Sequence, residues 1–181
     1  MIALIQRVTS AHVIVAEQCI AKIEQGLLVF LGVEKADTEA QANRLLERVL
    51  NYRIFSDTVG KMNLSLKDIS GELLVVPQFT LPADTRKGSR PSFTPAAPPQ
   101  QGQMLFAYFC QKAQDQHERV AMGQFGADMQ VHLVNNGLPY LVANAIILGF
   151  SAEIEPLSSQ RIAIATRKVS VIFKIALNPK R

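Results

Sequence analysis

The sequence predicts an α/β fold, a single domain with a mixed, largely antiparallel β-sheet and two main helices. Three observations support this class. Several short segments alternate apolar and polar residues with a period of two, residues 27–33 form one continuous apolar run, and two longer segments carry apolar residues at helical spacing. The hydrophobic fraction of 48% and the charged fraction of 19% are typical of a globular domain with its own core.

The first half of the chain contains four predicted elements. Residues 2–8 alternate as a half-buried strand, Thr9 and Ser10 indicate a turn, and residues 11–15 resume the alternation, so a hairpin is expected here. The apolar run 27–33 is typical of a strand covered on both faces. Next comes a helix with capping-box spacing at Thr38 and Gln41, whose apolar stripe is Ala42, Leu45, Leu46, Val49 and Leu50.

The second half continues with a strand at residues 72–76 and a loop at 82–102 that is rich in Pro, Gly, Ser and Thr. A second helix is expected over about 103–117, where it buries Leu105, Tyr108 and Phe109. The strand 128–134 directs Met129, Val131 and Leu133 to one face. Asn135, Asn136 and Gly137 then predict a turn that ends it.

The net charge of +4 is unevenly distributed. Residues 1–137 contain 13 basic and 13 acidic residues, whereas residues 138–181 contain 6 basic and 2 acidic ones. Bulk charge therefore does not indicate that the main body binds RNA.

Membrane segments and a secretory leader are not expected. The longest apolar stretch, 138–150, is interrupted by Pro139, Asn144 and Gly149 and is shorter than the roughly 20 residues of a spanning helix. The N-terminus has no basic lead or cleavage site, so a cytoplasmic protein is expected. Cys19 and Cys110 are interpreted as two buried, reduced thiols.

No metal site is predicted, because His12, His117 and His132 have no further ligands at metal-binding spacing. His132 lies on the strand face opposite the apolar one, which favours a solvated or satisfied histidine. Neither a nucleophile elbow nor a Gly-rich phosphate loop occurs. Nothing points to a Ser–His–acid triad, although the sequence leaves that arrangement open.

Thr80 is the best single candidate for a site, because it follows a buried strand and precedes a polar loop. The alternative interpretation is an ordinary turn threonine. Arg86, Lys87 and Arg90 can bind phosphate as charged donors, and the alternative there is a solvated loop.

Seven short motifs in this sequence resemble those of D-aminoacyl-tRNA deacylases, in order and spacing over about the first 137 residues. They are Met1-Ile2-Ala3-Leu4-Ile5-Gln6-Arg7-Val8, Gly26-Leu27-Leu28-Val29, Asn51-Tyr52-Arg53-Ile54-Phe55-Ser56-Asp57, Lys61-Met62-Asn63-Leu64, Gln78-Phe79-Thr80-Leu81, Arg90-Pro91-Ser92-Phe93 and Phe125-Gly126-Ala127-Asp128-Met129-Gln130-Val131. The resemblance implies a barrel-like core and a homodimer with active sites at the subunit interface. It also implies no metal or organic cofactor.

The implied substrate is a D-amino acid, or mischarged glycine, esterified to the 3′-terminal adenosine of tRNA. By this resemblance Gln78, Phe79 and Thr80 line the pocket, Met129 lies nearby, and Arg7 supports a second motif at Gly137. Hydrolysis of an activated ester needs mainly a positioned carbonyl, a water and donors for the oxyanion. Backbone N–H groups at residues 78–80 can be those donors, and the ribose 2′-hydroxyl can help activate water. Thr80 as nucleophile ranks second, because no base is evident near it.

The sequence departs from the family at two positions. Pro77 stands where the family has Ser, which removes a hydroxyl and a backbone donor. Gly137 is followed by Leu138, where the family has a Gly–cisPro element that enters the partner's pocket and excludes L-amino acids. A cis Gly137–Leu138 bond costs about 3–4 kcal/mol, so a trans bond is expected. Pro139 comes one residue late, and such a shift reverses the strand face that it presents.

The resemblance divides the chain into a deacylase-like domain at 1–137, incomplete at its end, and a divergent tail at 138–181. Residues 169–177 alternate as a strand that can pair with the sheet, although a disordered extension from an altered reading frame is the favoured origin. Three functions follow. They are an active deacylase with weakened chiral rejection, an impaired homologue that binds tRNA without turnover, and a misfolded product.

Overall fold

The sheet is built around β3 (Gly26–Gly32), in which every residue is buried. β3 pairs antiparallel with β1 (Ile2–Val15) and parallel with β6 (Glu72–Pro77). The computed structural model of the chain describes residues 1–86, 89–144 and 170–175. An apolar strand with partners on both edges and covered on both faces is what the run 27–33 predicts, and the structure confirms it.

The remaining strands extend this centre in both directions. The order is β7-β6-β3-β1-β8-β9, with β2 (Gln18–Ile23) paired to β1. The outer members are β7 (Val120–Met122), β8 (Met129–Asn144) and β9 (Ser170–Ile175), and β4 (Phe55–Ser56) pairs with β5 (Met62–Leu64) in a separate hairpin. The β3–β6 and β6–β7 pairs are parallel and the others antiparallel, so the predicted mixed, largely antiparallel sheet is confirmed.

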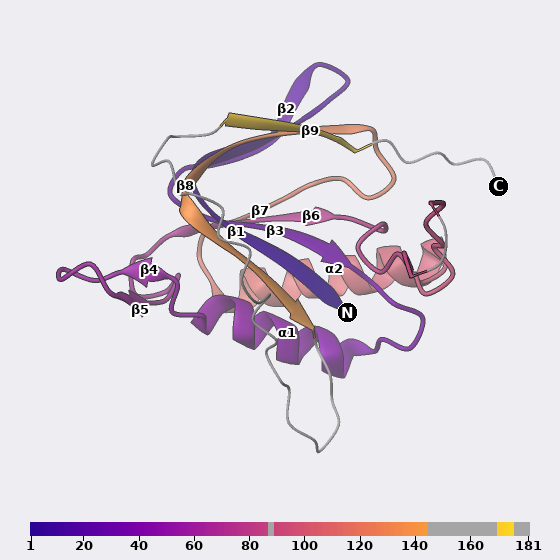
Figure 1. The fold of residues 1–181 in the computed structure, drawn as a ribbon, viewed down its shortest axis with the longest axis horizontal. Helices are drawn as coiled ribbons and strands as arrows, with labels where there is room; N and C mark the ends of the chain where they lie inside the picture. Colours follow the sequence, from indigo (N-terminus) through magenta and orange to yellow (C-terminus); the bar gives the residue numbers. More distant parts are fainter. Residues whose placement is uncertain (87–88, 145–169, 176–181) are drawn as a thin grey trace.

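Two hydrophobic clusters cover the two faces of this sheet. Leu27, Val29 and Leu31 of β3 point into the cluster formed with the helices α1 (Glu39–Asn51) and α2 (Pro99–Gln116). Leu28 and Phe30 point to the opposite side, where β2 and the first half of β8 cover them. Figure 1 shows both helices under one face, while β2, β8 and β9 curve over the other. This curvature gives the predicted barrel-like core.

Both helices were predicted, and the predicted cap of the first is confirmed. Thr38 caps α1 with the reciprocal contact to Gln41, as the capping-box spacing predicts. α2 begins at Pro99, earlier than the expected residue 103, because proline is suited to a first helical turn, where its missing N–H is not needed. Tyr108 of α2 is half-buried, and its hydroxyl bonds Asn43. Neither helix within the described ranges is long and apolar enough to cross a membrane.

The predicted hairpin at Thr9 and Ser10 is wrong. β1 runs unbroken from Ile2 to Val15, and the chain reverses instead at Ala16 and Glu17, whose φ angles are 47° and 66°. Two successive positive φ angles match a two-residue hairpin turn between twisted strands.

The predicted end of β8 at residue 134 is also wrong. The strand continues to Asn144, but its pairing with β1 jumps from Val8↔Asn135 to Gln6↔Tyr140. Residues 136–139 therefore face the single residue Arg7, and we call them the 136–139 bulge. The turn residues produce this bulge rather than a reversal. Gly137 has φ 78° there, and no peptide bond in the described ranges is cis, as expected for Gly137–Leu138.

Residues 140–144 form a closing ladder, although the departure from the family after Gly137 suggested that it was lost. They pair with β1 from Gln6 back to Ile2, with Ala143 buried and Leu141 packed against the helix-side core. Farther along, β9 pairs with β8 over Met129 to Val134. The predicted tail strand is thus confirmed for residues 170–175, and a disordered extension is wrong for them. Residues 145–169 and 176–181 lie outside the described ranges.

Two sequence interpretations of single residues need correction. Cys19 is exposed rather than buried, whereas Cys110 is buried, and burial raises the pKa of its thiol to about 12. His132 is half-buried and not fully satisfied. Its Nε2 is buried with no partner among the described residues, and its ring stacks on His12 with centroids 4.6 Å apart.

His12 lies in a row of basic groups that crosses three strands. It faces His132 of β8 on one side and Lys22 of β2 on the other, and Lys22 is itself paired with Glu24 at 2.9 Å. Burial, and then the charges of His132 and Lys22, lower the pKa of His12 below its usual 6.5. The folded protein therefore binds fewer protons near pH 6 than the unfolded chain does.

This shift predicts a stability that falls as the pH drops. Above pH 6.5 His12 is neutral in both states, and below that value the unfolded chain gains its proton first, so unfolding becomes favoured. We expect the Tm to fall by a few degrees between pH 7 and pH 5, and His12→Gln to reduce this fall. Thermal unfolding followed by circular dichroism at both pH values measures it. An unchanged pH slope in the variant would contradict this assignment.

Candidate functional site

The turn that follows β6 brings together the three residues of the Gln78-Phe79-Thr80 motif. The N–H of Gln78 donates to the carbonyl of Leu31 at 2.8 Å, which fixes the start of the turn to the end of β3. The N–H of Leu81 returns to the carbonyl of Gln78 at 3.3 Å, and the Gln78 side-chain amide donates to Thr80 Oγ1. All three motif residues are half-buried. The turn is thus closed by its own bonds and attached to the sheet.

Two backbone donors of this turn are unused. Within the described residues, the N–H groups of Phe79 and Thr80 have no hydrogen-bond partner, whereas those of Gln78 and Leu81 do. Adjacent free N–H groups on a rigid turn can stabilise an oxygen that gains negative charge. The turn can therefore act on a carbonyl group, with no charged side chain required.

The loop beyond the turn folds back over it. Phe79 packs against Phe93 with ring centroids 5.5 Å apart, and backbone bonds between Asp84 and Ser92, 2.8 and 2.9 Å long, close the loop. Arg86 donates from Nε and Nη2 to the two Asp84 carboxylate oxygens at 2.9 and 2.7 Å. These bonds hold the pKa of Asp84 well below its usual range. Arg90 is exposed on the same loop.

Pro77 and Met129 both lie next to Gly123. Both are buried, and a Cβ added to Gly123 would be 3.0 Å from Met129 Sδ and 3.3 Å from Pro77 Cδ. The structure therefore brings Met129 close to the start of the motif, as expected from the resemblance. The β6 ladder continues through Pro77, which is in register with Leu31. The missing donor of the proline does not disturb the strand.

Arg7 connects the 136–139 bulge to the rest of the fold. Its Nε donates to the carbonyl of Asn136 at 2.8 Å, and its Nη1 donates to the carbonyl of Ile54. Burial lowers the pKa of its guanidinium below its ordinary value. Arg7 thus holds the residue that precedes Gly137. Gly137 itself is exposed, and Leu138 follows it in the bulge.

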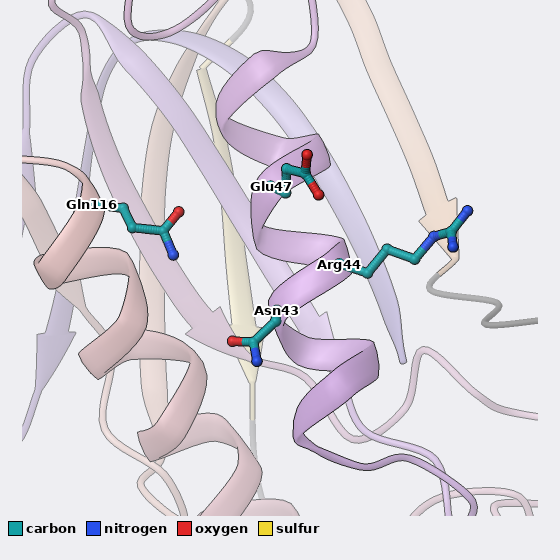
Figure 2. A pocket seen from close by; sticks show the side chains of 4 residues that line it. All are labelled: Asn43, Arg44, Glu47 and Gln116. Atoms are coloured by element: carbon teal, nitrogen blue, oxygen red, sulfur yellow. The ribbon is translucent and has the colours of Figure 1, made fainter.

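No histidine takes part in the turn. His117 Nε2 bonds the carbonyl of Gly71, before the first residue of β6, and His12 stacks on His132. No group of three or more metal-ligating side chains occurs in the ranges that the structure describes. An open depression lies between the helices, lined by Asn43, Arg44, Glu47 and Gln116, and it contains none of the candidate residues (Figure 2).

Sequence reasoning placed the turn but missed what holds it. Gly32 packs against the turn, and Gly123 packs against Pro77, which precedes it. A side chain on either glycine would occupy the space between them and these neighbours. The only local signal was a glycine at the end of the apolar run 27–33. The turn residues that they contact are far away in the sequence.

The family model described as D-Tyr-tRNA(Tyr) deacylase matches residues 4–143 of this chain. That match extends past Gly137 to the closing ladder of β8. A relative named D-aminoacyl-tRNA deacylase from Pseudomonas putida (strain W619) is 61% identical over 137 residues, which cover 76% of this chain and 94% of the relative. Another of the same name, from Stutzerimonas stutzeri (strain A1501), is 59% identical over the same shares.

Two solved structures share the fold. The structure titled "c-Myc DNA Unwinding Element Binding Protein" superposes with a TM-score of 0.76 and 35% identity, covering 80% of this chain and 98% of its own. A probable eukaryotic D-amino acid tRNA deacylase superposes with a TM-score of 0.72 over 79% of this chain and 98% of its own. At 16% identity the second likeness concerns the fold alone.

Proposed function

This chain belongs to the D-Tyr-tRNA(Tyr) deacylase family, and on that premise we propose that the turn 78–81 is where the ester of a D-aminoacyl-tRNA is hydrolysed. The protein is an ester hydrolase that releases a free D-amino acid and tRNA, which is a proofreading step of translation. The observation that carries this conclusion is the family match over residues 4–143, which includes the whole turn and the strands that hold it.

The unused N–H groups of Phe79 and Thr80 are the proposed oxyanion donors. Attack of water on the ester carbonyl moves negative charge onto its oxygen, and two fixed donors stabilise that charge without rearrangement. A single donor of this kind contributes about 10²–10³-fold to a rate. Gln78 positions Thr80 through its side-chain amide, and Phe79 with Phe93 forms an apolar wall beside the turn.

Water activation is assigned to the substrate rather than to a side chain. The ribose 2′-hydroxyl lies beside the 3′ ester by covalent structure, so it needs no residue to position it. The alternative, Thr80 as nucleophile, requires a base that removes the proton of its hydroxyl. The contact that the structure gives Thr80 Oγ1 is with the amide of Gln78, which donates and is no base. The three histidines bond or stack elsewhere.

Replacing Thr80 distinguishes these two mechanisms. We expect Thr80→Ala to lower kcat/KM for D-tyrosyl-tRNA by less than about tenfold, because the backbone donors remain. Loss of a true nucleophile lowers the rate by several orders of magnitude, roughly 10⁶-fold in a well-studied protease. Thr85→Ala, an exposed threonine in the following loop, is the matched control. A loss of 10³-fold or more in Thr80→Ala alone would favour the nucleophile.

We further propose that the protein forms a homodimer and that the 136–139 bulge of one subunit enters the site of the other. Two features support this role. The bulge places four residues, among them the exposed Gly137, opposite the single residue Arg7, and Arg7 holds its base. Gly137 is followed here by a trans bond to Leu138, where the family has a cis proline. A filter altered in this way is expected to reject L-amino acids poorly.

Hydrolysis of D-tyrosyl-tRNA and L-tyrosyl-tRNA, measured side by side with the purified chain, tests this function. We expect both substrates to be hydrolysed, with a D/L preference below about tenfold. Leu138→Pro, which restores proline after Gly137, is expected to raise that preference. Rapid loss of the D form alone would contradict the weakened filter. Loss of neither form would contradict the activity itself and leave tRNA binding without turnover.

Three smaller assignments complete the proposal. Arg90 and Arg86, which is paired with Asp84, contact phosphates of the acceptor end of tRNA. The affinity for tRNA should therefore fall as the salt concentration rises. The catalytic domain corresponds to residues 1–137 together with the closing ladder of β8, and β9 pairs with its sheet. The expected location is the cytoplasm, where charged tRNA is used.

A further inference from the structure

Gly32 lies directly beneath the turn 78–81. It is the last residue of β3, next to Leu31, whose carbonyl accepts the N–H of Gln78 at 2.8 Å. A Cβ added to Gly32 would lie 2.8 Å from Leu81 Cβ, 3.0 Å from Pro82 Cδ and 3.1 Å from the Gln78 carbonyl oxygen. The turn therefore packs onto the bare Cα of Gly32, in space that any side chain would occupy.

These contacts differ from those of other close-packed glycines. A Cβ on Gly26 would overlap the backbone of Glu72 within the sheet, and a Cβ on Gly71 would meet the side chains of Leu66 and Ile69. All three contacts of Gly32 are instead with the turn and the proline that follows it. Gly32 is also not among the glycines with positive φ, so alanine can adopt its backbone conformation. The three atoms nearest to an added Cβ all belong to the turn and to Pro82.

We propose that Gly32 is a positioning residue for ester hydrolysis, since its missing side chain sets the distance between the turn and β3. This inference rests on the proposed function of the turn. It concerns the direction of the Phe79 and Thr80 N–H groups, which the backbone of the turn sets. Because the bonds from Leu81 N–H to Gln78 and from Ala83 N–H to Thr80 close the segment, pressure on Leu81 moves the whole turn.

The expected displacement of the turn in Gly32→Ala is small but large enough to lower the rate of hydrolysis. A Cβ to Cβ separation of 2.8 Å must grow by several tenths of an ångström to reach ordinary contact, and Leu81 Cβ cannot rotate away. The pressure acts on the turn from the β3 side and moves it outward from the sheet. Misplacement by about 1 Å at a catalytic centre costs on the order of 10²-fold in rate. A displacement of several tenths of an ångström therefore predicts a loss in kcat of about tenfold.

The test compares Gly32→Ala with the unchanged full-length chain. Deacylation of D-tyrosyl-tRNA is measured at a temperature well below both melting transitions, and circular dichroism reports the folded fraction. We expect kcat per folded molecule to fall by about tenfold, with KM changed by less than about twofold. Gly102→Ala is the matched control, because its methyl group meets a ring atom of Phe125 at 3.3 Å, away from the turn. It should keep the original kcat.

A second variant separates displacement from simple destabilisation. Leu81→Gly removes the atom that a methyl group at position 32 would meet first. Gly32→Ala combined with Leu81→Gly should therefore recover part of the kcat lost in Gly32→Ala, which is a coupling between neighbours. If Gly32→Ala does not fold, the double variant provides the test. The positioning role then requires that the double variant folds and is active, provided that Leu81→Gly alone is active.

The outcomes distinguish this inference from the function on which it rests. An original chain that does not hydrolyse D-tyrosyl-tRNA overturns the proposed function and this inference together. An active original chain with an equally active, folded Gly32→Ala variant overturns the positioning role alone. The positioning role is likewise overturned if Gly32→Ala lowers only the Tm, or if Leu81→Gly gives no recovery.

Discussion

Gly26→Ala is expected to lower the free energy of unfolding severely. A Cβ at this position would lie 1.8 Å from the carbonyl oxygen of Glu72 and 2.6 Å from its nitrogen. Both are backbone atoms of the neighbouring strand, so no side-chain rotation relieves the overlap. β3 and β6 would have to separate where their parallel ladder begins, at Gly26↔Glu72. Such a separation disturbs the hydrophobic clusters on both faces of the sheet.

The expected cost of Gly26→Ala exceeds about 4 kcal/mol, which is a large part of the roughly 5–15 kcal/mol that stabilises a typical domain. Urea unfolding followed by circular dichroism measures it. Gly60→Ala is the control, because nothing lies within 4 Å of the added carbon and only its positive φ of 81° opposes the change. That variant should lose about 1–2 kcal/mol. A Gly26→Ala protein as stable as Gly60→Ala would show that the ladder adjusts easily.

Arg7→Ala is expected to have the second-largest effect, on stability and activity together. The guanidinium donates to the carbonyls of Asn136 and Ile54, and no other described side chain donates to either. Each hydrogen bond from a charged donor contributes about 1.5–3 kcal/mol, so losing two costs about 3 kcal/mol or more. The base of the 136–139 bulge would then be free to move. We expect a lower Tm and a further loss of D/L preference.

Arg7→Lys is the matched variant for this prediction. Lysine keeps the charge, but its single ammonium group cannot reproduce the fork that reaches two separate carbonyls. It should retain one bond and lie between the original chain and Arg7→Ala in Tm. Thermal unfolding and the two tyrosyl-tRNA substrates provide the measurements. If Arg7→Ala keeps both the original Tm and the original D/L ratio, Arg7 does not hold the bulge.

The elements predicted accurately from sequence are those that local chemistry determines. Thr38 and Gln41 cap α1 within one turn, and the apolar run 27–33 is buried because each of its residues is apolar. The elements predicted wrongly depend on distant partners. Thr9 and Ser10 remain in β1 because they pair with β8, more than 120 residues later in the sequence, and Thr9 is accommodated as an extra residue between Val8↔Asn135 and Ser10↔Val134.

In the candidate site, too, the features set by local sequence were predictable and those that depend on distant residues were not. Thr80 at the end of a buried strand was predictable from its local pattern, and so was Gln78 beside it. The partner of the Gln78 N–H, Leu31, and the glycine that the turn packs on could not be read locally, because they belong to another strand. The free N–H groups of Phe79 and Thr80 depend on the geometry of the turn, which residue types alone do not specify.

The 136–139 bulge also separates the two halves of β8 into independently registered ladders. Residues 129–135 pair with β1 on one side of it and residues 140–144 on the other, and the residues between them break the continuity of register from one ladder to the other. A gene can therefore exchange the coding sequence beyond this point for unrelated sequence without shifting the half of the strand that carries Met129. The new segment needs only the alternation that places Leu141 and Ala143 inward. The bulge is thus a position after which the end of the chain can be replaced during evolution.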